Sequence, residues 1–370
     1  MSTINSIEFG IVNKNLIKPY ELSFITVTSI YCFWVCVIDN DGEIGIGEAV
    51  PLPGYGCETI ETMWQFANAV IPKLKGRSKS EVIHKLLSYS PNNAFAASAI
   101  ATAVEFSSWI DKIYKIKSVP LVYPLTASMS TENMDEQITN GLKQGFRHFK
   151  MKIGKNLEAD LISSMFMLKQ YDGLNYTFRF DANQAYSLNE AENFCRSLES
   201  VNCGTVLWIE QPLGRNEWNE TEALCGKTSI PIMLDESIYN EHDIRRAKNI
   251  GCKAVKLKLF KHAGISECLR LAKIANNLGL SVVIGNGVSS DIGNLCEALV
   301  INDAPELFVS GAECNGFTKL KEKIAFDQLS LSSGQLIWNN INDIILNDIV
   351  ASIKNQSLKS FYQISRNEKV

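Results

Sequence analysis

The stretch HFKMKIG, residues 148–154, carries two lysines, Lys150 and Lys152, inside an apolar run that predicts a β-strand. Side chains alternate between the two faces of a strand, so both ammonium groups point to the same face. On a sheet surface in water such a pair has no special meaning. Inside a closed barrel the pair places two cations in a confined space, which is costly unless they have partners or a function.

The sequence that follows this stretch predicts a barrel. Between residues 121 and 334, short apolar runs alternate with helical stretches, as is typical of a parallel α/β fold. The predicted strand ends recur every 23 to 29 residues. Six or seven such units fit a modified (β/α)8-type barrel better than an open sheet. No glycine-rich dinucleotide fingerprint follows the first strand, which weakens the doubly wound alternative.

Residues 1–120 show a different order of strand-like and helical patterns, which predicts an α+β unit. Runs rich in β-forming residues come first and meet at a hairpin signal, Asp41-Gly42, and helical periodicity follows. The polar tail, from about 335 to 370, is expected to return to this unit. The chain therefore divides into an N-terminal domain completed by the tail and a barrel domain over 121–334.

Composition excludes several classes of function. The 370 residues are 46% hydrophobic and carry a formal net charge of -4 without a basic block, so nucleic acid is not an expected partner. No apolar stretch of about 18 residues occurs, and the N-terminus lacks the apolar core of a signal peptide. We expect no membrane association and a cytoplasmic location. The ten cysteines form no C-x-x-C pair and are expected to be reduced.

Three carboxylates end three consecutive predicted strands: Asp181, Glu210 and Asp235. The chemistry of a barrel lies at the carboxyl ends of its strands. Three oxygen ligands that converge there describe a Mg²⁺ site with positions left for water and substrate. The alternative is that each carboxylate caps the following helix. Three in a row, each after an apolar run, favour the metal.

Lysines flank these carboxylates, with Lys152 one strand before them and Lys258 one strand after. Strands on opposite sides of a barrel face each other, so the two ammonium groups can approach one bound molecule from opposite faces. A lysine beside other cations and a metal has a lowered pKa and can act as a base, with Lys150 as the neighbour that tunes it. The alternative is that these lysines extend to water at the strand ends.

Taken in order, six motifs resemble the enolase superfamily, in particular its muconate lactonizing enzyme subgroup, which includes dipeptide epimerases, N-succinylamino acid racemases and o-succinylbenzoate synthases. The motifs are GEAVPLPGYGCET, KMKIG, FDANQ, WIEQP, LDES and KLKLFKHAG. The resemblance covers nearly the whole chain. The seventh predicted strand ends in IGNG without a histidine, unlike mandelate-racemase-like members. The resemblance implies an α+β capping domain over the modified barrel.

The resemblance also implies roles for individual residues. It implies Mg²⁺ on Asp181, Glu210 and Asp235, acid/base chemistry at Lys152 and Lys258, and contact of Lys150 with the substrate carboxylate. Glu236 is implied as a partner of Lys258. Asn183 is expected, like Glu236, to stand behind the catalytic and metal-binding side chains. Glu313 and Asn315 stand where dipeptide epimerases carry an Asp-x-Asp that holds the substrate ammonium. Tyr20 and Tyr55 are expected in segments over the barrel mouth.

The implied activity is Mg²⁺-dependent removal of a proton alpha to a carboxylate, through a metal-stabilised enolate. We favour racemisation or epimerisation of an amino-acid derivative or dipeptide, with a small-molecule carboxylate as substrate. The alternatives are a syn-dehydratase or cycloisomerase of the o-succinylbenzoate synthase or muconate type and, more remotely, a non-catalytic binding protein on the same barrel. Both enzyme classes use the same lysines and the same metal. The sequence is also compatible with a homo-oligomer.

Overall fold

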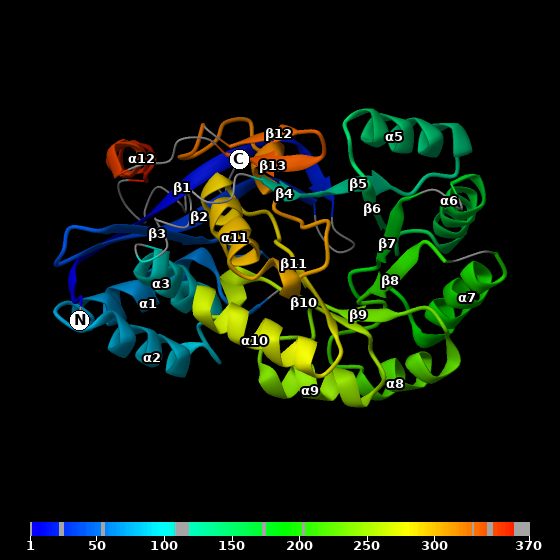
Figure 1. Ribbon diagram of the computed structural model, residues 1–370, viewed down its shortest axis with the longest axis horizontal. Helices are drawn as coiled ribbons and strands as arrows, with labels where there is room; N and C mark the ends of the chain where they lie inside the picture. Colours follow the sequence, from blue (N-terminus) through cyan, green and yellow to red (C-terminus); the bar gives the residue numbers. More distant parts are fainter. Residues whose placement is uncertain are drawn as a thin grey trace.

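Figure 1 shows a computed structural model of the chain. It describes the following ranges: 2–21, 26–52, 56–106, 108, 118–171, 175–201, 204–327, 329–338 and 343–358. Within these ranges, no helix combines the length and the apolar character needed to cross a bilayer.

The N-terminal domain is an antiparallel sheet covered by helices. Its three strands, in the order β1-β2-β3, are β1 (Ile4–Glu21), β2 (Thr26–Asp39) and β3 (Ile44–Ala49). The helices are α1 (Ile60–Val70), η1 (Ile71–Lys73), α2 (Lys79–Tyr89) and α3 (Ala94–Phe106). Helix α3 is buried along its whole length. It lies directly on β3, because a Cβ atom at Gly47 would come within 2.2 Å of the Ala99 carbonyl oxygen.

The second domain is a curled parallel sheet wrapped by helices (Figure 1). Its seven strands pair in sequence order and are β5 (Val122–Thr126), β6 (His148–Lys152), β7 (Thr177–Asp181), β8 (Val206–Glu210), β9 (Ile232–Leu234), β10 (Ala254–Leu257) and β11 (Ser281–Ile284). The α-helices after these strands are α5 (Thr131–Lys143), α6 (Leu157–Gln170), α7 (Leu188–Glu199), α8 (Trp218–Lys227), α9 (Glu241–Asn249), α10 (Ile265–Asn277) and α11 (Asp291–Asp303). Short 3-10 helices are η3 (Leu259–Lys261), η4 (Pro305–Leu307) and η5 (Gly316–Lys319). The expected fold class, a modified barrel with an N-terminal α+β domain, is confirmed.

An irregular segment, residues 309–313, takes the place of an eighth barrel strand. On one side, the Val309 N–H donates to the Val282 carbonyl at 2.8 Å. On the other side, the Val122 N–H donates to the Ala312 carbonyl at 3.0 Å, and Leu121 and Ala312 form a parallel bridge. The segment therefore joins β11 to β5 and closes the ring of strands.

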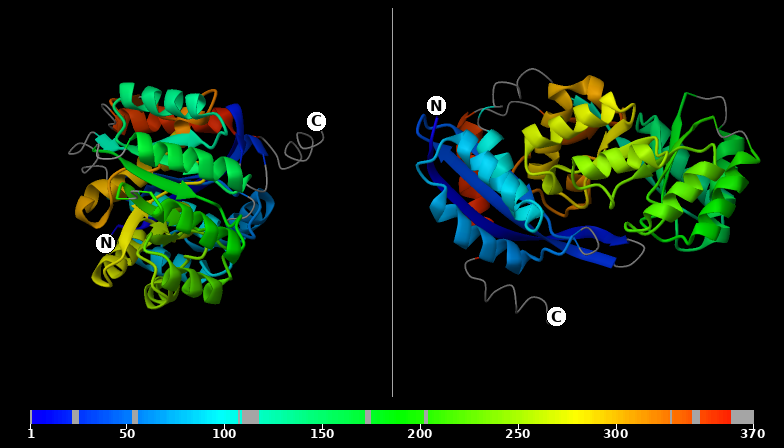
Figure 2. Two further views of the ribbon diagram at one scale, coloured as in Figure 1. Left: turned by 90° about the vertical axis from the view of Figure 1, so that its right-hand side faces the viewer. Right: turned by 90° about the horizontal axis from the view of Figure 1, so that it is seen from below.

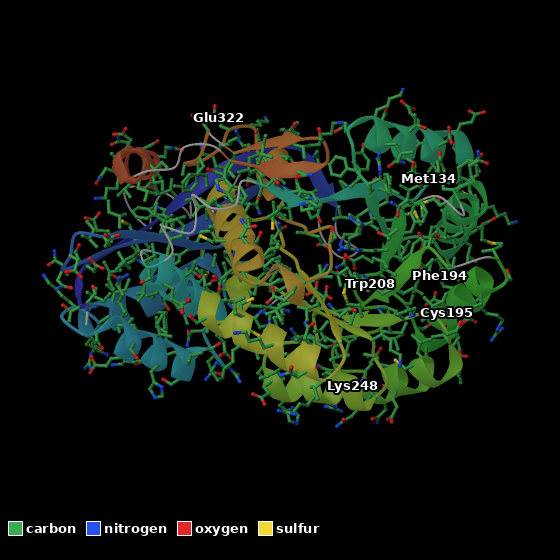
Figure 3. All side chains as sticks on the ribbon, in the orientation of Figure 1. Met134, Phe194, Cys195, Trp208, Lys248 and Glu322 are labelled. Atoms are coloured by element: carbon green, nitrogen blue, oxygen red, sulfur yellow. The ribbon has the colours of Figure 1, made fainter. Side chains whose placement is uncertain are left out.

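Arg179 anchors this irregular segment from inside the barrel. Its fully buried guanidinium donates to the Gly311 carbonyl at 2.6 Å and to the Ser310 carbonyl. The guanidinium also lies 4.7 Å from the ring centre of Trp208, which Figure 3 shows among the strands. Trp208 belongs to a small apolar cluster below the strand ends, whose other buried members are Met233, Ala254 and Val283.

The C-terminal part returns to the first domain. Helix α12 (Asp343–Gln356) packs against β1 and β3, as Figure 2 shows. The Leu358 N–H donates to the Ile11 carbonyl at 2.9 Å. Between barrel and tail lies a three-stranded sheet of β12 (Ser330–Ser332), β13 (Gln335–Ile337) and β4 (Ser118–Pro120). Residues 339–342 and 359–370 lie outside the described part.

Candidate active site

The three strand-end carboxylates lie at the same end of the barrel. The register places Lys152 beside Asp181 and Asp181 beside Glu210 on neighbouring strands, and Asp235 follows β9 directly. All three carboxylates are buried. They do not cap the following helices, whose cap positions are taken by Ser187, Glu217 and Asn240. The helix-cap alternative is therefore wrong.

Lys150 holds two of these carboxylates together. Its Nζ lies 2.7 Å from Asp181 Oδ2, 2.9 Å from Glu210 Oε2 and 2.9 Å from Glu313 Oε1. Lys256 joins the same group, with its Nζ 2.5 Å from Glu210 Oε1 and 2.7 Å from Glu313 Oε1. Neither lysine extends to water, since Lys150 is 7% and Lys256 0% exposed.

The central position of Lys256 was missed by the sequence analysis. The sequence signal for Lys256 was its position two residues before Lys258, which repeats the K-x-K spacing of Lys150 and Lys152. At that spacing the two side chains share one strand face. Gly285, directly after the neighbouring strand β11, leaves room for the Lys256 side chain, because a Cβ there would lie 2.5 Å from the Lys256 Cδ.

Lys152 stands nearer the opening, with 28% of its side chain exposed. Its Nζ lies 2.5 Å from Asp181 Oδ2 and donates to Asn183 Oδ1 at 2.5 Å. Burial disfavours the charged lysine, but the Asp181 carboxylate outweighs burial and raises the pKa of Lys152 above its ordinary value. This direction is opposite to the sequence-based expectation, which assumed that neighbouring cations and a bound metal lower the pKa of the lysine.

Lys258 faces Asp235, with its Nζ 2.6 Å from Oδ2. Burial would raise the pKa of Asp235, but Lys258 and its neighbour Lys261 lower it to about 2. Lys261, also missed by the sequence analysis, donates to the Asp235 main-chain carbonyl at 2.8 Å. Burial raises the pKa of Glu236, while Lys258 acts against this shift. The Asn183 amide donates to Glu236 Oε1 at 3.0 Å, so Asn183 links Glu236 to Lys152.

These side chains line a small cavity of about 60 Å³. The cavity brings together the expected metal ligands, both expected acid/base lysines, and four expected substrate contacts: Lys150, Glu313, Asn315 and Tyr20. Glu236 and Asn183 stand behind its wall. Tyr55 lies outside the described residues, as does most of the second half of the segment 17–24. His262 is buried and lines a separate cavity between the domains.

The donor chemistry of Asp181, Glu210 and Asp235 fits a hard divalent cation, because all three offer carboxylate oxygens to one cavity. As they stand, no three acidic, histidine or cysteine side chains in the described ranges are close enough to hold a metal. Lysine ammonium groups occupy the spaces between the carboxylates instead. A cation held there must displace Lys150 and Lys258 from these oxygens.

A family model described as "Enolase C-terminal domain-like" matches residues 133–336, more than half of the chain. The chain belongs to the enolase superfamily. The match begins within α5 and ends within β13, so it contains every carboxylate and lysine that lines the cavity. Tyr20, in β1, lies outside the match.

Relatives within the enolase superfamily catalyse different reactions. The chain is 24% identical over 306 residues to the N-succinyl-L-Arg/Lys racemase of Bacillus cereus, covering 79% of this chain and 82% of the relative. It is 26% identical over 302 residues to the o-succinylbenzoate synthase of Geobacillus kaustophilus, covering 76% and 77%. The substrate-liganded L-Ala-D/L-Glu epimerase of Bacillus subtilis has the same fold, with a TM-score of 0.79 at 22% identity over 91% of this chain and 96% of that one. Superfamily membership therefore supports an enzyme and leaves isomerase and lyase open.

Proposed function

We propose that this superfamily member is a Mg²⁺-dependent racemase or epimerase that acts at the carbon alpha to a carboxylate of an amino-acid derivative or dipeptide. The observation that carries the proposal is the placement of Lys152 and Lys258 in one cavity on opposite strands. Counting the segment 309–313 as one position, the barrel has eight positions around its ring. Strand β6 and strand β10 are four positions apart in either direction.

This placement matches what inversion requires. A carbon that loses its proton becomes planar, and inversion needs a proton returned to the opposite face. One lysine in its neutral form accepts the proton, and the other, as an ammonium, delivers one from across the barrel. Asn183, which is not an expected metal ligand, holds the Lys152 nitrogen together with Asp181, and Asp235 holds the Lys258 nitrogen until a bound cation displaces it.

The remaining residues bind and shield the substrate. A divalent cation held by Asp181, Glu210 and Asp235 would stabilise the negative charge that develops on the substrate carboxylate. Lys150 adds a buried positive charge on the same side. Because Lys150 and the three carboxylates are buried, these charges act in a medium of low dielectric, where they have more effect than in water.

A lyase is the second candidate, favoured by the similarity to o-succinylbenzoate synthase. In a syn-dehydration or cycloisomerisation, Lys152 alone would move the proton. Lys258 would act only through its positive charge. The two candidates therefore differ in what Lys258 must do.

Proton exchange with D₂O separates the candidates. A panel of dipeptides and N-acyl amino acids is incubated with Mg²⁺ in D₂O, and deuterium at the alpha carbon is read by mass spectrometry. In a racemase, Lys258→Ala should exchange the proton of one isomer only, Lys152→Ala that of the other, and neither variant should interconvert isomers. Lys248→Ala, on the outer helix α9 (Figure 3), is the control and should behave like the parent.

Variants at the same two lysines also distinguish a lyase from a racemase. In that case Lys152→Ala should be inactive toward every substrate, whereas Lys258→Arg should keep part of the activity because it keeps the charge. Interconversion of isomers by either alanine variant at near the parent rate would refute the two-base scheme. Absence of exchange and of turnover across the panel in the parent protein would count against both enzymes.

A further inference from the structure

Lys319 places an extra cation at the active-site cavity. It lies on η5 and lines the same cavity as Lys152 and Asp181. Its Nζ is 4.2 Å from the ring centre of Tyr20, an attractive arrangement of a cation over an aromatic face. No carboxylate among the described residues forms an ion pair with Lys319. Its charge is therefore available to a molecule in the cavity.

Both domains hold Lys319 in place. Directly after η5, Leu320 forms an antiparallel bridge with Leu16 of β1, and the Lys321 N–H donates to the Asn15 carbonyl at 3.0 Å. Glu322, labelled in Figure 3, continues this junction with an ion pair to Lys14 at 3.4 Å. The ammonium thus stands where the barrel and the capping domain meet, over the ring of Tyr20.

Glu313, the carboxylate expected to hold a substrate ammonium, already has two cationic partners. Lys150 and Lys256 both reach its Oε1, at 2.9 and 2.7 Å. Burial would raise the pKa of Glu313, but these lysines outweigh burial and lower it below its ordinary value. A substrate ammonium would have to replace a buried lysine there, which would leave that lysine without its partner.

The charges that line the cavity also favour an anionic group of the substrate over an ammonium. Its lining contains five lysines and four carboxylates, listed as Lys150, Lys152, Lys256, Lys258 and Lys319 against Asp181, Glu210, Asp235 and Glu313. Lys256 and Glu313 offset each other. The surplus positive charge is that of Lys319, and any bound divalent cation would add to it.

We infer that Lys319, over the ring of Tyr20, binds a second anionic group of the substrate, so that the enzyme prefers N-acyl amino acids with a carboxylate on the acyl chain to dipeptides with a free ammonium. This inference rests on the proposed function for the first carboxylate. It assigns a specificity-determining role to Lys319 and Tyr20. Glu313 serves instead to keep Lys150 and Lys256 in place.

The test compares two isosteric compounds. One is an N-succinyl amino acid, and the other carries a terminal amide in place of the distal carboxylate. The parent should prefer the carboxylate by tenfold or more in kcat/KM for alpha-proton exchange. Lys319→Gln should reduce this preference to about one, mainly by raising KM. Lys319→Arg and Tyr20→Phe should keep it, since they retain the charge and the ring.

Lys321→Gln is the matched control, because Lys321 is exposed two residues away and its loss changes the net charge equally. It should leave the preference unchanged. A preference that survives in Lys319→Gln, or a parent that favours L-Ala-L-Phe over the succinyl compound, would overturn the inference.

A binding measurement tests Lys319 independently of turnover. Isothermal titration calorimetry with Mg²⁺ compares glutarate with its monoamide. Tighter binding of glutarate to the parent, lost in Lys319→Gln and kept in Lys321→Gln, supports the inference even if no compound exchanges its proton and the proposed function fails. Equal affinity of the parent for both probes would overturn it.

Discussion

The Nζ of Lys258 lies 2.6 Å from Oδ2 of Asp235, and both side chains are 1% exposed. A lysine expected to move protons thus neutralises a carboxylate expected to bind metal. A buried carboxylate left without a cation is strongly disfavoured. The lysine and a metal ion can therefore exchange as partners of Asp235, and metal binding should be measurable as a change in stability.

We predict that Mg²⁺ raises the melting temperature of the parent protein by a few degrees. A ligand at 100 times its Kd adds about 2.7 kcal/mol to the stability of the folded state. Asp235→Asn should abolish the Mg²⁺-dependent rise, measured by differential scanning fluorimetry with and without EDTA. Asp327→Asn, at an exposed position, should keep the rise. An equal Mg²⁺ response in Asp235→Asn would remove this residue from the metal site.

Asn183 is predicted to act by positioning Lys152. Its Oδ1 accepts from Lys152, and its amide donates to Glu236. Asn183→Gly should lower kcat by roughly 10- to 100-fold, with less effect on KM, a loss similar to that caused by removing a group that orients a metal ligand. Glycine is chosen because the φ of 43° at Asn183 suits it without strain.

The control for this change is Asn216→Gly, at an exposed position beyond β8. It should leave kcat unchanged. A fall in thermal stability without a fall in kcat for Asn183→Gly would mean that Asn183 supports the fold and not the lysine.

Arg179 is predicted to stabilise the barrel closure. Its guanidinium donates to the carbonyls of Ser310 and Gly311 in the segment that replaces an eighth strand. Arg179→Met keeps much of the volume and removes both charge-assisted hydrogen bonds, so it should cost roughly 3 kcal/mol in the free energy of unfolding. Urea denaturation measures this loss. Arg196→Met, at an exposed position, should cost little, and an equally small cost for Arg179→Met would contradict the prediction.

Glu297 is predicted to make stability fall as the pH rises. Burial raises its pKa to about 8 from an ordinary value of 4.5. The folded chain thus keeps a proton that the unfolded chain loses above pH 4.5, so the free energy of unfolding should fall between about pH 4.5 and 8. One such group contributes roughly 1 kcal/mol per pH unit.

Glu297→Gln resembles the protonated side chain and should flatten this decline, measured as the melting temperature from pH 5 to 9. Glu306→Gln, at an exposed position, should follow the parent profile. A decline in Glu297→Gln as steep as in the parent would assign the pH dependence to other groups.

The barrel, the order of its strands and the carboxylates at the strand ends could all be predicted from the amino-acid sequence. These features are predictable because they depend on local patterns in the sequence. Apolar runs of strand length, helical periodicity and the even spacing of strand ends are visible without knowing what packs against what. The two-residue spacing of Lys150 and Lys152 likewise predicts that they share a face, and both reach Asp181.

The pairing of the charges could not be predicted in this way, because it depends on the tertiary structure. The contact of Lys256 with Glu313 joins residues 57 positions apart, and that of Lys319 with Tyr20 joins the end of the barrel to the first strand of the chain. Such pairs depend on which side chains the closed ring brings within a few ångströms, and no local pattern encodes that. The direction of the Lys152 pKa shift has the same origin, since it depends on the distance to one carboxylate.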